Sequence, residues 1–281
     1  MIENKLQSTI LKTIAHIFLI IVALACLCPF LIIISASITS EDALVAHGYG
    51  LLPKDIDFSA YKMIAQNSKD MINAYLVTIG TTAIGCVGSL LMIIMAAFPL
   101  SRMDYKWRTG LNFYFYFTML FSGGLVSSYI INTQVLGLAN NILVLIWPMM
   151  FGVYNMFLMR TYFKAIPAAM WEAAEIDGAG KIRKFFSVTL PMISPVFQTI
   201  LLLAINGTLH IGEYIIVMTN GAPAGKTHTV GSYVISTFLP GFSTGNPNIG
   251  YGCAMALCSS VIYGLVALIY MKASKKMQEV Y

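Results

Sequence analysis

Five long stretches of the chain contain no Asp, Glu, Lys or Arg, and they constrain its fold more than any other feature. These uncharged stretches are Thr13–Ser40, Met71–Ser101, Thr109–Met159, Phe185–Gly212 and Thr227–Met271. Each is long enough to contain a membrane-spanning helix, which needs about 20 mostly apolar residues. Only 10% of the residues are charged, against roughly 25% in a soluble domain. The pattern excludes an ordinary soluble enzyme and a disordered protein, and it predicts an all-α integral membrane protein.

Two of these stretches contain more than one element. Thr109–Met159 is long enough for two helices, which the polar residues between Asn132 and Asn141 separate. Thr227–Met271 begins with a loop, because residues 241–250 are rich in Gly, Asn, Pro and Ser. Six spans are therefore expected, at about residues 14–36, 73–99, 111–131, 142–163, 193–219 and 250–271.

The first apolar stretch is longer than the core of a secretory signal peptide, which has about 7–15 residues. We therefore expect it to remain in the protein as a membrane helix. Ser35-Ala36-Ser37 is nevertheless a passable cleavage site, and Ala23-Leu24-Ala25-Cys26 is a loose lipid-attachment pattern. Removal of this segment is the alternative.

Lys and Arg are distributed unevenly between the two sides of this arrangement. The termini and the loops on their side carry 13 of them, whereas the opposite loops carry 4, namely Lys54, Lys62, Lys69 and Lys226. Because cytoplasmic loops are enriched in Lys and Arg, both termini are expected in the cytosol. The net charge of +5 then reflects membrane topology, and no nucleic-acid partner is expected.

The sequence contains no recognisable motif for catalysis or metal binding. A metalloprotease helix motif and a Cys-x-x-Cys pair are both absent from the 281 residues. Gly178–Lys181 and Gly221–Thr227 imitate a phosphate-binding loop, but their glycine spacing differs from that motif. We therefore expect no catalytic residue, no metal and no cofactor in this chain.

The longest loop on the expected cytosolic side, residues 164–191, is unlike a flexible linker. Pro167 suits the start of a helix, and the Ala-rich stretch Ala168–Ile176 predicts a short helix. Glycines at 178 and 180 interrupt it, and Lys181–Val188 is expected to form a second short helix. Exposed apolar residues on such a pair indicate a protein partner. The alternative is a hairpin that lies on the membrane surface without a partner, although its face is only weakly basic.

This loop resembles the EAA loop of ABC importer permeases. The match runs through Glu172-Ala173-Ala174-Glu175-Ile176-Asp177-Gly178-Ala179, is followed by Leu190-Pro191 and Pro195, and extends upstream to Phe157–Arg160 and Ile166-Pro167. The resemblance implies a type I ABC importer permease of six transmembrane helices, with a cytosolic coupling loop between spans 4 and 5. The residues that it assigns to coupling with an ATPase are Met170, Trp171, Glu172, Ala173, Ala174, Asp177, Gly178, Leu190 and Pro191.

Pro29–Ser37, Leu52-Pro53 and Tyr61 extend the resemblance to the maltose-type second permease of binding-protein-dependent sugar importers. It implies a multi-pass protein of the bacterial cytoplasmic membrane that forms half of a carbohydrate pathway, with an oligosaccharide as the expected substrate. The implied partners are a second homologous permease chain, two ABC ATPase subunits that carry ATP and Mg, an extracellular substrate-binding lipoprotein and membrane lipid. Residues 1–72 would hold the N-terminal tail, first helix and outer loop, 73–271 the permease core, and 272–281 a cytosolic tail.

Two other functions share parts of this pattern. A permease for a different solute, such as a polyamine, phosphate or a peptide, would carry the same EAA loop. An integral-membrane enzyme would use His210 and Glu213 and would act without an ATPase partner.

Asn206, His210 and Glu213 are spaced so that they share one face of the fifth span. Ionisable residues inside a membrane are costly and usually face a cavity or a polar partner. We predict that they line the substrate pathway together with Tyr154 and Asn155, whose ring and amide suit stacking on a sugar and hydrogen bonding to it. Interhelical hydrogen bonds, a proton relay and plain packing are the alternatives.

The outer loop between the fifth and sixth spans, about residues 220–250, is far longer than a typical connection of about 4–6 residues. It carries Tyr233, Phe238 and Phe242 among Gly, Ser, Thr and Pro. We expect Thr229–Phe238 to form a short ordered segment. The resemblance implies that the three aromatic residues contact the docked binding protein, and a loop folded back over its own helices is the alternative.

Overall fold

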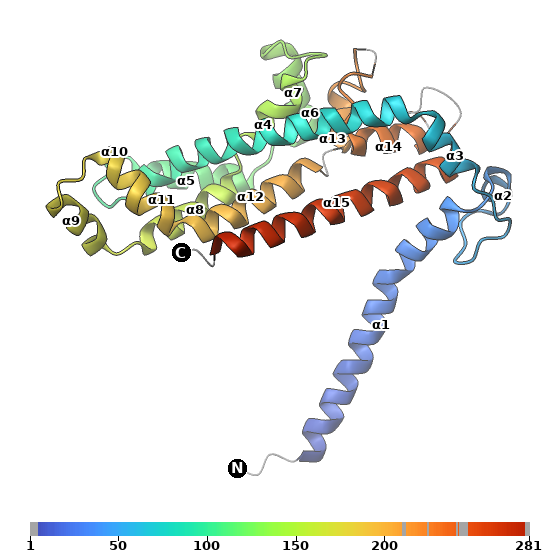
Figure 1. Ribbon diagram of the computed structural model, residues 1–281, viewed down its shortest axis with the longest axis horizontal. Coiled ribbons are helices and arrows are strands. Elements are labelled where there is room, and N and C mark those ends of the chain that lie inside the picture. Colours follow the sequence, from blue (N-terminus) through green and yellow to red (C-terminus); the bar gives the residue numbers. More distant parts are fainter. Residues whose placement is uncertain (1–4, 210–211, 224, 240, 242–246, 279–281) are drawn as a thin grey trace. The chain divides into compact units, whose positions relative to one another are not determined.

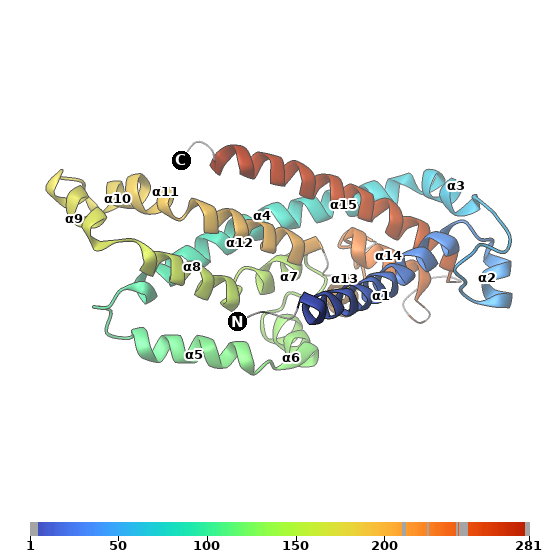
Figure 2. The same ribbon diagram turned by 90° about the horizontal axis from the view of Figure 1, so that it is seen from below.

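The computed structural model describes residues 5–209, 212–223, 225–239, 241 and 247–278. Within these ranges the chain is helical, apart from its loops and one isolated antiparallel bridge between Thr39 and Ile56. Figures 1 and 2 show its helices, which belong to two compact units. The first contains Met1–Ser68 and Ser236–Val261, and the second contains Lys69–Ile235 and Ile262–Tyr281.

Among the residues that the structure describes, three helices are each long and apolar enough to cross a membrane. They are α1 (Lys5–Ser37), α4 (Ser68–Ser101) and α15 (Ile249–Gln278). These elements contain the spans expected at 14–36, 73–99 and 250–271, so the three helices are confirmed.

The span expected at 111–131 is a bent pair of helices. α5 (Arg108–Leu120) is bent by 112° from α6 (Gly124–Ile130), which continues into the π-helical turn η1 (Ile131–Val135). Gly124 has a φ of +75°, a left-handed conformation that glycine adopts without a steric penalty. The prediction of one continuous helix is therefore wrong here, because two consecutive glycines allow the chain to turn.

The span expected at 142–163 is also divided, whereas the bend beside the span expected at 193–219 lies at its start. The helix α7 (Leu143–Ile146) and the 3-10 turn η2 (Trp147–Met149) meet α8 (Val153–Ala165) at 42°. The segments α10 (Lys181–Lys184), η3 (Phe185–Thr189) and α11 (Leu190–Met192) meet α12 (Ser194–Leu209) at 72°, and α13 (Gly212–Met218) completes this region. The proline in η2 and the one in α11 lack the amide hydrogen that a regular helix needs. The described residues thus contain three candidate spans, or up to six if each bent pair is one span.

In the first unit, a carboxylate fixes the start of the last helix. Glu41, at the beginning of α2 (Glu41–His47), accepts hydrogen bonds from the backbone N–H groups of Ile249 and Gly250, both at 2.9 Å. Amides in the first turn of a helix have no partner within it, and the helix dipole favours a negative charge at this end. A second contact joins α1 to α3 (Ser59–Gln66), where the Ser37 and Tyr61 hydroxyls lie 3.0 Å apart.

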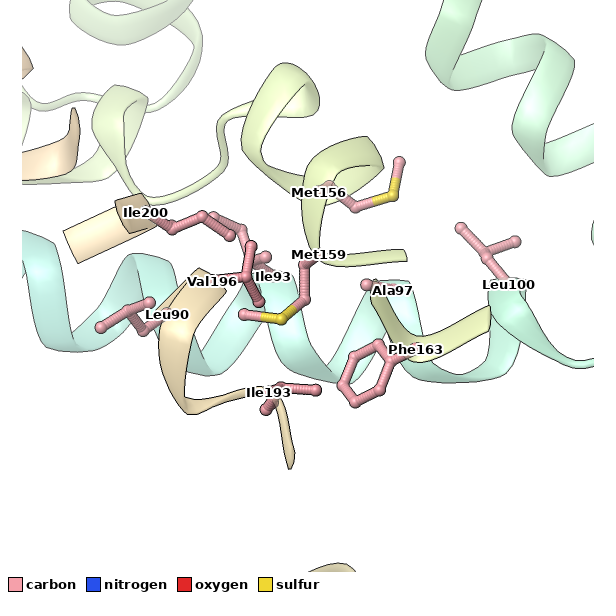
Figure 3. Close-up of a cluster of buried hydrophobic side chains, with 10 residues drawn as sticks. All are labelled: Leu90, Ile93, Ala97, Leu100, Met156, Met159, Phe163, Ile193, Val196 and Ile200. Carbon is pink, nitrogen blue, oxygen red and sulfur yellow. The ribbon is translucent and has the colours of Figure 1, made fainter. Parts of the chain in front are cut away.

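The core of the second unit is formed by α4, α8 and the chain around the start of α12 (Figure 3). Ile93, Ala97 and Leu100 recur at the spacing of one helix face, and they meet side chains from the other two segments. The buried residues are Leu90, Ile93, Ala97, Leu100, Met156, Met159, Phe163, Ile193, Val196 and Ile200. Helices that meet in lipid are held by close packing rather than by exclusion of water, so this interlocking is what aligns the three segments.

Candidate functional site

The chain between α8 and α12 forms two short helices that turn at a glycine. α9 (Ala168–Ile176) ends in a Schellman cap, in which the N–H of Ala179 donates to the Ala174 carbonyl at 2.9 Å and the N–H of Gly178 donates to the Glu175 carbonyl at 3.0 Å. This cap needs a left-handed residue, and Gly178 has a φ of +72°. The predicted helix and glycine turn are therefore confirmed. We call residues 168–184 the knob, which lies at one end of the second unit (Figure 1).

A salt bridge closes the knob across its turn. Lys184 Nζ lies 2.6 Å from Glu175 Oε1. The hydrogen bond from Lys184, and then its positive charge, lower the pKa of the Glu175 carboxyl below its ordinary value. The pair joins the end of α9 to the end of α10. Because Glu175 is exposed, solvent screens this contact, and its main effect is on the relative orientation of the two helices.

Most residues predicted to couple with an ATPase lie on the surface of the knob. Met170 is 46% exposed, and Glu172, Ala173, Asp177 and Gly178 are exposed as well. Two further apolar side chains are still more open, with Ile176 at 86% and Ile182 at 77%. A cluster of exposed apolar side chains beside charged ones is typical of a surface that another protein covers. Ala174, Leu190 and Pro191 are half-buried, and Leu190 packs against the core.

Trp171 differs from its neighbours because its ring packs against its own chain. The ring centroid lies 3.8 Å from Cζ of Arg102 and 5.7 Å from the ring centroid of Phe98. Phe98 also meets Phe163 at 5.5 Å and Phe185 at 6.1 Å, both edge to face. We call these five residues the inner ring cluster. Each aromatic pair contributes about 0.5–1.5 kcal/mol beyond area burial, and a partly exposed cation–π contact about 0.5–1 kcal/mol.

The sequence predicted no role for Arg102 or Phe98. They lie far from Trp171 in the chain, and their only signal is a basic and an aromatic residue at the end of an apolar stretch. That signal is common at membrane surfaces, so it could not have identified the partner of Trp171.

Of the residues predicted to line a pathway, Asn155 borders a cavity between α4, α8 and α12. This cavity has a volume of about 280 Å³ and is lined by Gly85, Cys86, Ser89, Met149, Gly152, Asn155, Leu203, Ala204 and Gly207. Small residues from α4 and α12 leave the space open, and the Asn155 amide supplies donors and an acceptor at its edge. Tyr154 is 62% exposed and does not line this cavity.

The polar residues of the fifth span are not gathered around Asn155. Asn206 borders a separate hollow of about 80 Å³ with Tyr263 and Tyr270. Glu213 is exposed in the first turn of α13, and His210 lies outside the described residues. An interhelical hydrogen bond that was not predicted occurs nearby, where the Asn132 amide donates to the Tyr214 hydroxyl at 3.1 Å.

The residues after α13 return towards the start of α4. The Val230 N–H donates to Thr78 Oγ1 at 3.0 Å. Thr227 Oγ1 donates to the Ala222 carbonyl at 2.7 Å and lies 2.9 Å from Thr219 Oγ1. We call Thr219–Ile235 the folded-back segment. Its buried hydroxyls satisfy buried backbone groups, which is the arrangement that the alternative for the outer loop predicted.

The ordered segment predicted at Thr229–Phe238 is confirmed as the helix α14 (Val230–Phe238). Three aromatic residues were predicted to contact the binding protein. Two of them, Tyr233 and Phe238, lie in α14 and are partly covered by the chain itself. Tyr233 meets His228 edge to face at 5.9 Å, and Phe238 packs so closely on Gly252 that a Cβ there would lie 2.7 Å from the Phe238 Cβ. Phe242 lies outside the described residues.

Comparison with known proteins places this geometry in a wider context. A family model described as a binding-protein-dependent transport system inner membrane component matches residues 87–277. The polygalacturonan/rhamnogalacturonan transport system permease protein YtcP of Bacillus subtilis is 34% identical over 184 residues, which are 65% of this chain and 63% of that protein. The alignment thus spans less than two thirds of YtcP. The multiple sugar-binding transport system permease protein MsmF of Streptococcus mutans is 27% identical over 79% of this chain and 82% of its own length.

A solved structure is similar over nearly the whole chain. It is described as a bacterial ABC transporter involved in the import of the acidic polysaccharide alginate. One of its chains matches with a TM-score of 0.79 and 28% identity, covering 95% of this chain and 97% of that one.

Proposed function

We propose a function that proceeds from one premise: the chain belongs to the family of binding-protein-dependent transport system inner membrane components. In this proposal it is a transport subunit of an ATP-driven importer and not an enzyme. It forms half of a translocation pathway, and a second homologous permease chain forms the other half. Two ATPase subunits hold ATP and Mg on the cytosolic side, and an extracellular binding lipoprotein delivers the substrate.

The exposed apolar surface of the knob is the observation that carries this proposal. Ile176 and Ile182 are open on the two sides of the turn between the short helices, Met170 is open in the first turn of α9, and residues 172–178 carry the EAA-type pattern. A helix pair closed by a Schellman cap and a salt bridge is preorganised, which lowers the cost of binding a partner. In this proposal the knob is the EAA coupling loop between the fourth and fifth of six spans, and it docks on an ATPase subunit.

The proposed membrane topology follows the distribution of Lys and Arg. In this topology α5 with α6 and α7 with α8 each form one span and α12 with α13 forms the fifth, both termini are cytosolic, residues 73–271 form the permease core, and the flanking residues 1–72 and 272–281 hold the first helix and the tails. A cysteine that replaces exposed Arg183 should react with an impermeant maleimide only from the cytosolic side. A cysteine that replaces Lys226 should react only from outside, and the reverse pattern contradicts this orientation.

The proposed substrate is a carbohydrate, most simply an oligosaccharide. Support comes from the relatives, whose names describe transport of polygalacturonan/rhamnogalacturonan and of multiple sugars, and from the alginate importer structure. The cavity beside Asn155 is small for an oligosaccharide, and in this proposal it becomes a pathway only when the second permease supplies the facing half. Asn206, His210 and Glu213 would extend that pathway. Tyr233, Phe238 and Phe242 would contact the binding protein.

The test is reconstitution of the permease pair with its ATPases and binding protein in proteoliposomes. An oligogalacturonide, a galacto-oligosaccharide and maltotriose are offered as sugar probes, with phosphate, spermidine and a tripeptide as the competing solute classes. ATP-dependent uptake of at least one sugar probe and of none of the other solutes is expected. Uptake of phosphate, spermidine or peptide in place of the sugars would overturn the substrate class while leaving the transport mechanism in place.

A pair of neighbouring residues tests the pathway. Asn155→Leu keeps the size of the side chain but removes its hydrogen bonds at the cavity, so sugar uptake should fall about tenfold. Tyr154→Leu changes an exposed neighbour and should have a smaller effect. If the two variants lose the same amount of sugar uptake, the cavity is not part of the pathway.

A further inference from the structure

The inner ring cluster connects the knob to the end of α4. Arg102 directly follows α4, which ends at Ser101, and Phe98 lies within its last turn. The Trp171 ring meets both of them, at 3.8 Å from the Arg102 Cζ and 5.7 Å from the Phe98 centroid. Arg102 also lies 5.1 Å from the Phe98 ring. A movement of α9 therefore acts on α4 through these contacts, in addition to acting on α12 through the chain.

Phe98 extends the connection to two other segments. Its ring meets Phe163 in α8 and Phe185 in η3, so α4, α8, α9 and η3 converge on one side chain. Packed rings have few alternative arrangements, and closely packed interiors transmit strain rather than absorb it. The four segments should consequently move together at this point.

The other end of the connection is the cavity beside Asn155. Gly85, Cys86 and Ser89 of α4 line that cavity. Cys86 lies 12 residues before Phe98, which is about 18 Å along a helix. A displacement of the end of α4 is thus carried along a continuous helix to the cavity wall.

We propose that Trp171 and Arg102 are positioning residues that pass the movement of the ATPase-bound knob to α4 and so to the cavity wall. This inference rests on the proposed function, since it needs an ATPase that moves the knob. It assigns Trp171 a role different from that of Met170 and Ile176. Those residues dock on the ATPase, whereas Trp171 faces the bundle and joins the docked knob to it.

The test uses the complete complex in nanodiscs and a native reporter. Cys86 is kept, and Cys26, Cys28, Cys253 and Cys258 are replaced by Ser, so that a membrane-permeant maleimide reports on α4 alone. In the parent complex, Mg·ATP should change the Cys86 labelling rate about fivefold. In Trp171→Ala this ratio should fall close to one, while the ATPase subunits stay bound and still hydrolyse ATP.

Two conservative changes and one matched control sharpen the test. Trp171→Phe keeps a ring and should restore most of the response, and Arg102→Lys keeps the charge without the planar stacking group and should restore part of it. Trp107→Ala is the control, because Trp107 is 66% exposed and its cation contact is with its neighbour Lys106. It should behave like the parent.

Three results would overturn the inference. They are a parent complex in which Cys86 does not respond to Mg·ATP, a Trp171→Ala complex that responds like the parent, and a Trp171→Ala complex that loses its ATPases. Failure of the proposed function gives a different pattern. Ile176→Asp and Met170→Asp place a charge on the docking surface and should release the ATPases, so normal retention in both would remove the knob as the docking site.

Discussion

The knob and the folded-back segment are both connections beside α4, yet they use their side chains in opposite ways. The knob exposes Met170, Ile176 and Ile182 and contacts the end of α4 through Trp171. The folded-back segment contacts the start of α4 through Val230 and buries its hydroxyl groups. Thr78 and Phe98, the two contact points, are 20 residues apart, which is about 30 Å along the helix.

The difference shows what each connection is suited to do. Thr227, Thr229 and Ser232 are at most 3% exposed and bond within the segment, so this connection is complete in itself. The knob satisfies its backbone at the cap but leaves apolar side chains open, so it is incomplete until a partner covers it. Gly178 in the knob and Gly221 in the folded-back segment both have a positive φ. Substituting each of them therefore tests the difference between the two connections.

The largest expected effect is at Gly221, in the folded-back segment. Its φ is +78°, and a Cβ there would overlap the imidazole ring of His228, a side chain whose burial lowers its pKa. Gly221→Ala therefore adds overpacking of about 1–3 kcal/mol to the left-handed penalty. Gly178→Ala adds only the cost of the left-handed backbone conformation, because nothing lies within 4 Å of its Cβ position. Thermal unfolding in detergent should show a clearly larger loss for Gly221→Ala, and equal losses would contradict the contrast.

The next effect concerns the buried hydroxyl of Thr227. Thr227→Val keeps the shape of the side chain but leaves the Ala222 carbonyl and Thr219 hydroxyl without this partner. The expected cost is about 1–3 kcal/mol, seen as faster proteolysis within residues 219–235. Thr109→Val, at an exposed position, is the control. Unchanged protection in Thr227→Val would mean that the segment does not depend on its internal bonds.

A smaller effect is expected at Gly178, and it should appear in coupling more than in stability. Gly178→Val forces a β-branched residue into the left-handed region, at a cost of about 1–2 kcal/mol. Gly178→Asn should be tolerated better, because Asn visits this region. ATPase retention should therefore fall in the order Gly178, Asn, Val. Equal retention by the Asn and Val variants would show that the cap does not position the docking surface.

The smallest effect is that of the Lys184–Glu175 salt bridge on the knob. The folded-state pKa of Glu175 is lowered, so the pair's contribution is present above the ordinary Glu range, about pH 4.3, and is lost as the pH falls through the lowered value. Hydrogen exchange of residues 175–184 should rise slightly in Glu175→Gln at neutral pH. The difference from the parent should vanish at acid pH and shrink in high salt. If the difference in hydrogen exchange persists at acid pH, the salt bridge is not its cause.

Local structure followed closely from local sequence. The helix at Ala168–Ile176 and the glycine turn after it were predictable because a cap depends on residues that are neighbours in the chain. The ordered segment at Thr229–Phe238 was expected for another reason, because a disordered loop would carry fewer aromatic residues. The bend of 112° within the third expected span was not predicted, although Gly123-Gly124 carried a signal for it.

The candidate site was less predictable than the helices. The spacing of Asn206, His210 and Glu213 predicts a shared face only for one straight helix. Asn206 borders a hollow with Tyr263 and Tyr270, whereas Asn155 borders the larger cavity with Gly85 and Gly207. Which residues line a common space depends on how separate helices pack, and spacing within one helix contains no information on that.

The sequence by itself determined that the chain is helical and apolar, where the knob turns, and which type of permease it resembles, because hydropathy, capping and motifs are local properties. Only the tertiary structure decided which way each knob side chain faces. Trp171 lies one residue from Met170 and Glu172. Its ring packs against Arg102 and Phe98, whereas the side chains of its two neighbours are exposed. The physical reason is that a buried position is defined by atoms from distant parts of the chain, and their approach follows from packing three helices into one core.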